Sequence, residues 1–255
     1  MGQGHRIAGI SGYTVRPPEA RSKPKVSAFI SANVEKIEAL RPDLVLAFSD
    51  LQADIAAALV RRGLTVMVFN QRSVAEILQM IRTLGGLVGC AAEADVLATK
   101  LESDLDRIRE SAERFPTRLR VFFEEWDDPL ISGIRWVEEL VAIAGGEPIF
   151  PELGQAALAR DRIVDPGEAA HRDPEVIFAS WCGKKVRKAT ITGRPGWGAV
   201  NAVRDGRIFE IKSTYILQPG PASLTEGVRQ LHALLARVHG IEVNPELAAL
   251  KRLGS

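Results

Sequence analysis

Residues 92–115, AEADVLATKLESDLDRIRESAERF, decide how this chain is organised. Apolar side chains recur in them at steps of three and four residues, which places them along one stripe of an α-helix. No Gly or Pro interrupts the segment, and Pro116 marks its end, because proline is excluded from a helix interior and disfavours helical backbone at Phe115. The sequence predicts one long, mostly exposed helix from Ala92 to Phe115. Its stripe consists of Ala94, Val96, Leu97, Leu101, Leu105 and Ile108.

The segments on both sides of this helix alternate short apolar runs with helical patterns. A chain of 255 residues is long enough for one large α/β domain or for two lobes of roughly 100 residues each. We therefore expect an N-terminal α/β lobe over residues 1–91, a linker helix over 92–115 and a C-terminal α/β lobe over 116–255. A single helix between two strands of one sheet is the alternative.

The composition is that of an ordinary globular protein, with 46% hydrophobic and 25% charged residues. The formal net charge of +1 provides no electrostatic footprint for nucleic acid. No apolar run approaches the ~20 residues of a membrane span, so membrane insertion is not expected. The first residues, MGQGHRIAGIS, lack the features of a secretory signal, and the chain as given would stay in the cytoplasm. Cys90 and Cys182 lie too far apart to suggest a zinc or redox motif.

In the N-terminal half, strands and helices alternate at the spacing of parallel βαβ units. Residues 44–48 and 66–69 read as strands buried on both faces, and residues 6–11 as an earlier short strand. The expected helices run from a cap at Ser31 or Asn33 to Leu40, from Asp50 to a stop at Gly63, and from Ser73 to Leu84 before Gly85-Gly86.

After the long helix the same alternation restarts. The expected strands cover residues 118–123, 176–179 and 208–211, and residues 125–133 are expected to be irregular. The expected helices cover residues 136–144, 166–172 and 224–238, with a turn and short helix over 193–199 and a last helix from Asn244.

Ligands of open parallel sheets collect at the carboxyl ends of the strands. Three of the four tryptophans and both tyrosines fall in or beside the loops at those ends. Aromatic side chains there can stack on a large planar ligand, because they bury much area at little entropic cost. The alternative is that they pack beneath the loops that carry them. The loops concerned contain residues 11–14, 48–50, 124–128, 180–185 and 212–215.

Signals for catalysis or metal binding are weaker. The four histidines are scattered, and His232 and His239, seven residues apart on one helix, suit surface or packing positions better than a ligand pair. Cys182 beside Lys184 and Lys185 is a candidate for a lowered pKa, although a buried thiol fits equally well. The carboxylates of residues 124, 125, 127 and 128 suit solvated or capping roles better than a general acid and base pair. We therefore predict no catalytic residue, no metal site and no bound cofactor.

Several segments resemble one family of binding proteins. ISGYTVRPPEARSKPKVSAF (10–29) and NVEKIEALRPDLVLAFSDLQADIAAALVRRGLTVMVF (33–69) resemble the N-terminal lobe of the cobalamin and iron-siderophore substrate-binding proteins of ABC importers. FEEWDDPLISGIRWVEELVAIAGGEPIF (123–150), SWCGKK (180–185), RPGWGAVNAVRDGRIFEI (194–211) and LQPGPASLTEGVRQL (217–231) resemble its second lobe, closer to the cobalamin-binding branch. The similarity covers roughly residues 5 to 240.

This resemblance implies two Rossmann-like α/β lobes with mainly parallel sheets, joined by the long helix, with the ligand in a cleft between them. Family members normally begin with a further strand and helix, so the first βα unit is expected to be missing. The implied ligand-binding residues are Tyr13, Phe29, Ser49, Trp126, Trp181, Lys184 and Tyr215. Glu35 matches a glutamate that docks to the importer permease, whereas Leu217 stands where its C-terminal counterpart is expected and Glu226 lies too far along.

The leading hypothesis is non-enzymatic binding of a corrinoid, cobalamin or a precursor, as the substrate-binding component of an ABC-type uptake system, periplasmic by resemblance. A haem or ferric-siderophore binding protein is the alternative, supported by the cations Arg16, Arg21, Lys184, Lys185 and Arg187. An enzyme or chaperone of tetrapyrrole handling that uses Cys182 and Glu125 is a rival from another class. An interaction module that has lost its ligand is a third option.

Overall fold

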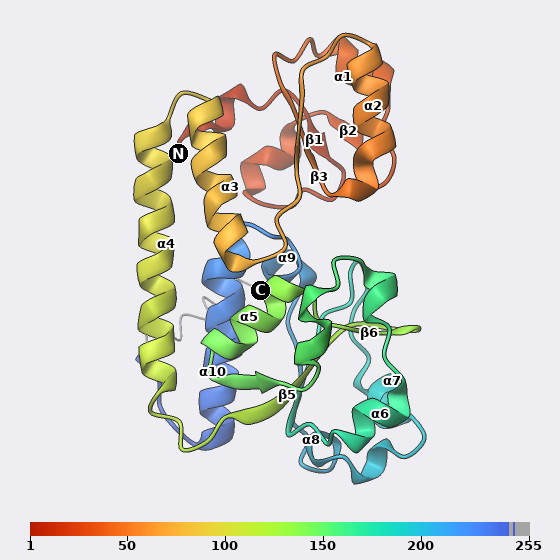
Figure 1. Cartoon of the computed structure of the whole chain (residues 1–255), viewed down its shortest axis with the longest axis vertical. Helices are drawn as coiled ribbons and strands as arrows, with labels where there is room; N and C mark the ends of the chain where they lie inside the picture. The colour runs from red at the N-terminus through yellow and green to blue at the C-terminus, as the bar shows by residue number, and fades with distance from the viewer. Residues whose placement is uncertain (245–246, 248–255) are drawn as a thin grey trace.

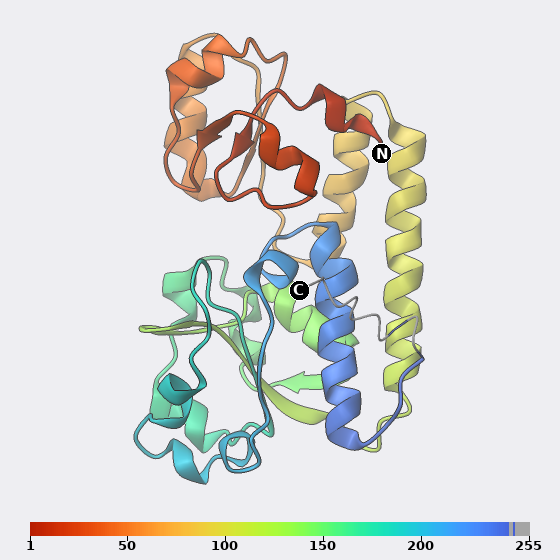
Figure 2. The same ribbon diagram turned by 180° about the vertical axis from the view of Figure 1, so that it is seen from behind.

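The computed structural model describes residues 1–244 and 247. Two α/β lobes lie on one side of a long helix, α4 (Ala91–Ala112), as Figure 1 shows. The predicted α/β fold with two lobes and a helix between them is confirmed. The buried side chains of α4 are spaced three or four residues apart, and they face α3 (Val74–Leu87), α5 (Arg135–Ile143) and α10 (Val228–His239). Figure 2 shows α4 from behind, with both lobes again on the same side of it.

The linker helix ends at Ala112, three residues before the predicted end. Its buried stripe contains Ala94, Ala98, Leu101, Leu105, Ile108 and Ala112. Val96, which the sequence placed on the stripe, is largely exposed, because it lies off the face that meets the neighbouring helices.

The described N-terminal strands form two separate two-stranded parallel sheets, β1 with β2 and β3 with β4. The lobe is built from η1 (Gln3–Arg6), β1 (Ile10–Ser11), η2 (Pro18–Ser22), β2 (Lys25–Ser27), α1 (Val34–Ala39), β3 (Val45–Phe48), η3 (Asp50–Gln52), α2 (Ala53–Arg61) and β4 (Val66–Phe69). The first strand is thus shorter than predicted, since residues 3–6 form a 3₁₀ turn. Asn33 caps α1 by accepting a hydrogen bond from the Lys36 backbone, as expected.

Strands β3 and β4 are not buried on both faces, and that prediction was wrong. Leu46 is 47% exposed and Val68 is 38% exposed. The reason is that β3 has β4 as its only strand partner among the described residues, so no wide, covered sheet encloses them.

Helix α3 begins at the predicted cap Ser73, which forms a capping box with Glu76, so that each side chain accepts a hydrogen bond from the backbone N–H group of the other residue. The predicted stop at Leu84 was wrong, because the helix continues through Gly85 and Gly86 to Leu87. A Cβ atom on Gly85 would lie 2.1 Å from the Cβ of Ala94, so this glycine allows α3 and α4 to approach closely. Buried side chains of α3 pack into the same core as the C-terminal lobe, and the lobe boundary at residue 91 stays a prediction.

The C-terminal lobe has a five-stranded sheet in the order β6-β5-β8-β9, with β7 also paired to β5. Only β6 is antiparallel to its neighbour. Its elements, besides α5 and α10, are β5 (Leu119–Asp127), β6 (Leu130–Ser132), β7 (Gly146–Pro148), η4 (Pro151–Gln155), η5 (Ala159–Arg162), α6 (Pro166–His171), β8 (Val176–Ala179), α7 (Lys188–Thr192), η6 (Trp197–Ala199), α8 (Asn201–Arg204), β9 (Ile208–Glu210), α9 (Ser213–Ile216) and η7 (Ser223–Gly227).

Residues 124–127 belong to strand β5 rather than to a loop, which corrects the expectation of an irregular stretch. They pair with β6 across a turn at Asp128-Pro129, so the strand gains an antiparallel partner for its last residues. Val164 extends this edge through a backbone hydrogen bond to Leu130 of 2.9 Å. The partner strand β6 has only three residues, too few to show an alternating pattern in the sequence.

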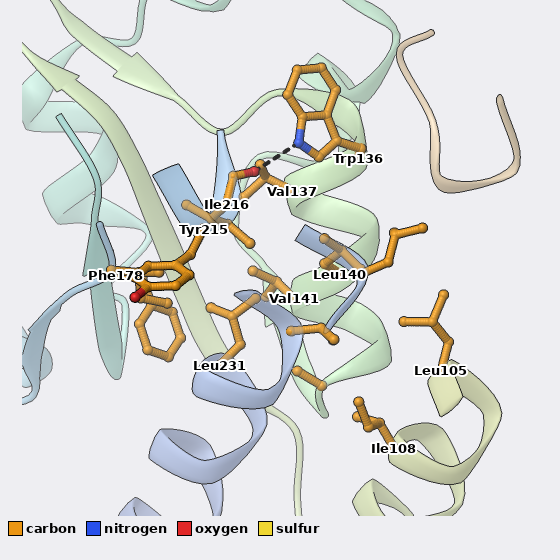
Figure 3. Packing of buried hydrophobic residues seen from close by; sticks show 14 of the residues in the cluster. Leu105, Ile108, Trp136, Val137, Leu140, Val141, Phe178, Tyr215, Ile216 and Leu231 are labelled. Carbon is orange, nitrogen blue, oxygen red and sulfur yellow. Dashed lines mark hydrogen bonds between the residues drawn. The ribbon is translucent and has the colours of Figure 1, made fainter. Parts of the chain in front are cut away.

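The predicted helix over 224–238 is confirmed, with its first turn in π-helical form over Ser223–Gly227 and its end at the left-handed Gly240. Side chains from α4, α5, α9 and α10 form one core on one face of the C-terminal sheet, as Figure 3 shows. Phe122, Ile177 and Trp197 belong to a second core cluster. The last predicted helix, from Asn244, falls almost entirely outside the described residues.

Candidate ligand-binding site

The carboxyl ends of the strands in the two lobes face each other. Arg16, which follows β1, lies with Nη1 3.0 Å from Oε1 of Glu226 in the C-terminal lobe. Gln71, which follows β4, donates a hydrogen bond of 3.1 Å from Nε2 to the carbonyl oxygen of Pro219. These contacts join loops at the strand ends of one lobe to the region after β9 in the other. A ligand held between the lobes would therefore meet the strand-end loops that the sequence singled out.

Large apolar side chains stand exposed at the strand ends of the N-terminal lobe. Tyr13 is 58% exposed and Phe29 is 40% exposed. The backbone N–H of Gly12 donates to Ser27, which holds the Tyr13 loop against the end of β2. The ring of Phe29 lies 6.4 Å from that of Phe48, centroid to centroid, which places it beside the end of β3. The exposed group consists of Tyr13, Phe29, Ile30 and Leu51, and we call it the N-lobe apolar face.

Ser49 supports this face rather than lining it. It is buried, has a positive φ of 80°, and donates from its hydroxyl group to Asp50 while accepting from the Leu51 backbone and from Arg72. The Ser49 hydrogen bond, together with the Arg72 guanidinium, holds the pKa of the Asp50 carboxyl group below its usual value despite some desolvation. The hydroxyl group of Ser49 thus has its partners within the protein.

Lys184 and the two predicted tryptophans come together in the C-terminal lobe. The Lys184 Nζ lies 4.1 Å from the ring centroid of Trp126 and 4.9 Å from that of Trp181, and it pairs with Asp127. Trp126 is half-buried at the end of β5 and donates from Nε1 to the carbonyl oxygen of Asp128. The structure thus brings Trp126 together with Trp181 and Lys184, which lie more than fifty residues further along the chain.

Trp181 is the buried member of that cluster. Its Nε1 donates a hydrogen bond of 3.0 Å to Oε1 of Glu124, whose carboxylate also accepts two hydrogen bonds from Arg194, of 2.6 and 2.8 Å. Burial raises the pKa of Glu124, while the bonds from Arg194 and Trp181 favour its ionised form. For Trp181 and Trp197 the alternative of packing beneath the loops describes what the structure shows.

Tyr215 is also largely buried, with its ring packed in the core beside Phe178 and Ile216, as Figure 3 shows. The guanidinium of Arg16 covers the ring at 4.0 Å from its centroid. Arg16 and Glu226 were not among the predicted site residues, because no local signal pairs two side chains 210 positions apart. The sequence pointed to Arg16 only as one of the cations that support the haem or siderophore alternative.

Two shallow hollows adjoin the described residues. One, of about 450 Å³, lies at the end of β5 and is lined by residues 127–130 and 163–166, including the half-exposed Ile163. The other, of about 530 Å³, lies on α4 around Thr99 and Ser103, away from the facing loops.

Comparison with known proteins identifies the family. Residues 1–215 match the sequence profile described as "Periplasmic binding protein". The chain belongs to the periplasmic binding protein family. It is 28% identical over 241 residues to an uncharacterized ABC transporter substrate-binding lipoprotein, YvrC, of Bacillus subtilis, covering 91% of this chain and 73% of that protein.

Two further proteins show the range of ligands among the similar ones. A vitamin B12-binding protein of Pectobacterium carotovorum is 25% identical over 200 residues, covering 76% of this chain and 70% of its own. The solved structure of the periplasmic heme-binding protein BhuT, in complex with two hemes, superposes with a TM-score of 0.75 at 22% identity, covering 91% of this chain and 88% of that one. The similarity to BhuT, at 22% identity, shows a shared fold.

Within this periplasmic binding protein, Glu35 lies in the first turn of α1 and its side chain is 73% exposed. Its ion pair to Arg62 is long, at 3.6 Å. A docking partner can reach it, and the docking role stays a prediction.

Cys182 does not have the lowered pKa that its lysine neighbours suggested. Partial desolvation and the Glu125 carboxylate raise the pKa of the thiol, although Cys182 is exposed, so the alternative of a buried thiol is wrong as well. Lys184 cannot compensate, because its ammonium group turns to Asp127 and the indole rings. A thiol with a raised pKa is a poor nucleophile at neutral pH, which weighs against the rival that used Cys182 as a reactive group.

The two histidines of α10 pack against the linker region. Nε2 of His232 lies 3.0 Å from the hydroxyl of Ser111, and Nδ1 lies 3.0 Å from the carbonyl oxygen of Ala144. The rings of both His232 and His239 contact Phe115, which confirms the predicted packing role. In the described part of the chain no three His, Cys, Asp or Glu side chains are grouped to hold a metal ion. Within residues 1–244 no helix is long and apolar enough to cross a membrane.

Proposed function

We propose that this periplasmic binding protein holds a corrinoid, cobalamin or one of its precursors, between its two lobes. The observation that carries the proposal is the N-lobe apolar face, where two aromatic and two aliphatic side chains stand exposed at the strand ends that face the other lobe. The similarity to vitamin B12-binding proteins supports it. In the cell the chain would then serve as the substrate-binding component of an ABC-type uptake system, outside the cytoplasmic membrane.

A large planar ligand with apolar faces suits this arrangement. Covering a large apolar side chain removes it from water and contributes on the order of 1.5–3 kcal/mol when burial is complete. Tyr13 and Phe29 present their rings on the N-terminal lobe, and Trp126 with Lys184 is the corresponding group on the other lobe. The amide groups around a corrinoid can accept from Lys184 and from backbone N–H groups. Ser49 and Trp181 would act indirectly, by holding the loops that carry these contacts.

Titration of the purified chain with cyanocobalamin, followed by tryptophan fluorescence and by calorimetry, tests this. We expect saturable binding, and Tyr13→Ala and Phe29→Ala should each raise Kd about tenfold, which corresponds to about 1.4 kcal/mol. Val60→Ala is the matched control, since Val60 is also 58% exposed but lies on α2. The proposal fails if cyanocobalamin gives no saturable signal or if the control weakens binding as much.

Haem is the second candidate, and one observation favours it. The hydroxyl group of the exposed Tyr13 has no hydrogen-bond partner among the described residues, and a tyrosine phenolate can ligate haem iron. Tyr13→Phe separates the two ligands, because it keeps the ring for stacking and removes the oxygen ligand. Corrinoid binding should survive this change. Haem bound through Tyr13 would instead lose its tyrosinate-to-iron charge-transfer band.

The permease contact proposed for Glu35 has its own test. In cells that depend on this chain for corrinoid uptake, Glu35→Ala should slow uptake while leaving the Kd of the pure protein unchanged. Glu19→Ala, an exposed glutamate in η2, is the control. Unchanged uptake in the Glu35 variant would remove Glu35 from the docking surface.

A further inference from the structure

Arg16 belongs to the N-terminal lobe, but among the described residues its side chain makes its hydrogen bond and its ring contact with the C-terminal lobe. It lies in the loop between β1 and η2, and its Nη1 donates to Oε1 of Glu226 at 3.0 Å. Its guanidinium carbon lies 4.0 Å from the centre of the Tyr215 ring. A cation over an aromatic face and a carboxylate at its edge together form a specific binding site for one guanidinium group.

The C-terminal side of this contact is rigidly built. Tyr215 on α9 is packed in the core, and Glu226 lies on the π-helical turn η7. The two elements touch at Gly227, where an added Cβ would lie 2.5 Å from the carbonyl oxygen of Tyr215. This close approach places the Glu226 carboxylate beside the Tyr215 ring. Hydrogen bonds from Thr225 and Arg16 keep the pKa of Glu226 below its usual value, although burial opposes them, so the carboxylate is ionised at neutral pH.

The N-terminal side is an exposed loop with few anchors. Its backbone is held within the lobe by the Thr14 N–H, which donates to Ser11, and by the Arg21 side chain, which donates to the carbonyl oxygen of Val15. Arg16 is its link to the other lobe, and Gln71 to Pro219 provides a second cross-lobe contact nearby. A loop held in this way can leave its receptor without unfolding either lobe.

We propose that Arg16 is a clamp residue, which holds the two lobes against each other by docking into the Tyr215 and Glu226 receptor. The clamp covers the ring face of Tyr215. The family resemblance makes Tyr215 a ligand-binding residue, and in that role, which rests on the proposed function, the ligand must displace Arg16 and thereby open the clamp. Arg16 and Tyr215 would then set how readily ligand enters.

Hydrogen exchange of the ligand-free protein, read by mass spectrometry, tests the clamp reciprocally. Arg16→Ala, a change in the N-terminal lobe, should speed exchange about tenfold in the peptide over residues 213–222 of the other lobe. Glu226→Ala, a change in the C-terminal lobe, should speed exchange by a similar factor in the peptide over residues 12–23. A purely local role predicts that each variant changes exchange within its own lobe alone.

Two controls sharpen the result. Arg21→Ala loosens the same loop without touching the receptor, and Glu147→Ala removes an exposed glutamate from β7. Neither should change exchange across the lobes. The clamp is overturned if Arg16→Ala and Glu226→Ala leave the opposite lobe unchanged, or if Arg21→Ala has the same cross-lobe effect. Because no ligand is present, this outcome is independent of cyanocobalamin binding, whose absence would overturn the proposed function alone.

Discussion

Glu138 makes the stability of the C-terminal lobe depend on pH in a direction that can be worked out from its surroundings. The side chain is buried on α5, and its Oε2 has no hydrogen-bond partner among the described residues. Burial raises the pKa of Glu138 to about 8, against an ordinary value of 4.5, although Arg162 and the Gly133 backbone N–H partly oppose the shift. The folded protein therefore keeps this carboxyl group protonated over a range in which the unfolded chain releases the proton.

The sign and size of this pH dependence follow from the difference in bound protons between the folded and unfolded states. Between pH ~4.5 and ~8 the folded state binds one more proton than the unfolded state at this position, so the free energy of unfolding falls by about 1.4 kcal/mol per pH unit as pH rises. Glu138→Gln keeps the shape and the acceptor for Gly133 but cannot ionise. The variant should therefore gain about 3.5 kcal/mol relative to the wild type between pH 5 and pH 8, slightly less than three full pH units of this slope, because the difference in bound protons is incomplete near both ends of the range.

Urea unfolding at pH 5, 6, 7 and 8, followed by tryptophan fluorescence, measures the effect. All four tryptophans, at positions 126, 136, 181 and 197, lie in the same lobe as Glu138, so the signal reports on that lobe. Glu147→Gln on β7 makes the same chemical change at an exposed position and should show no pH-dependent difference. A constant stability difference between Glu138→Gln and the wild type across these pH values would refute the reasoning.

Two further changes test the packing that supports the site. Gly85→Ala should lower the free energy of unfolding by about 1–3 kcal/mol, because the new methyl group would lie 2.1 Å from the Cβ of Ala94. Gly86→Ala is the control: its new methyl group would meet no atom within 4 Å, so the change should be neutral or should stabilise the protein by up to about 1 kcal/mol. Arg194→Met should cost about 3–5 kcal/mol, because it leaves the buried Glu124 carboxylate without its cation. Urea unfolding measures the change in the free energy of unfolding for the glycine and the arginine substitutions.

Each substitution is judged against its control by the difference in the free energy of unfolding between the two variants. Equal effects of the two glycine substitutions would show that helix propensity, rather than close approach of α3 and α4, sets their stability. For Arg194, the control is Arg204→Met, which removes an exposed partner of Asp205 and should change stability by less than about 1 kcal/mol. A loss at Arg204 as large as that at Arg194 would contradict the burial argument.

Features that depend on neighbouring residues were predictable from the sequence. The capping box of Ser73 and Glu76 and the Asn33 cap act within one helical turn, so their residue types are sufficient to place the starts of α3 and α1. The stripe of the linker helix is likewise a local periodicity, and it placed α4 to within one residue at its start. The resemblance of short motifs added the family.

Features that depend on residues far apart in the sequence were not predictable from it. Gly85 looked like a helix stop, yet Ala94 on the next helix explains it. Residues 124–127 looked like a loop, because the strand that pairs with them has only three residues and is itself held by Val164, more than thirty residues further along the chain. The lysines beside Cys182 suggested a lowered pKa, but Lys184 pairs with Asp127, and partial desolvation and the Glu125 carboxylate raise the pKa of the thiol.

The sequence by itself therefore determined the α/β class, the linker helix and the strand-end loops in which a ligand site was to be sought. The tertiary structure alone decided which side chains of those loops are available. It left Tyr13 and Phe29 exposed, buried Ser49 and Trp181, and brought Arg16 onto Tyr215 beside Glu226. The physical reason is that helical periodicity and capping are encoded within one or two turns. Burial and charge pairing are set by residues that meet only after the two lobes have packed on α4.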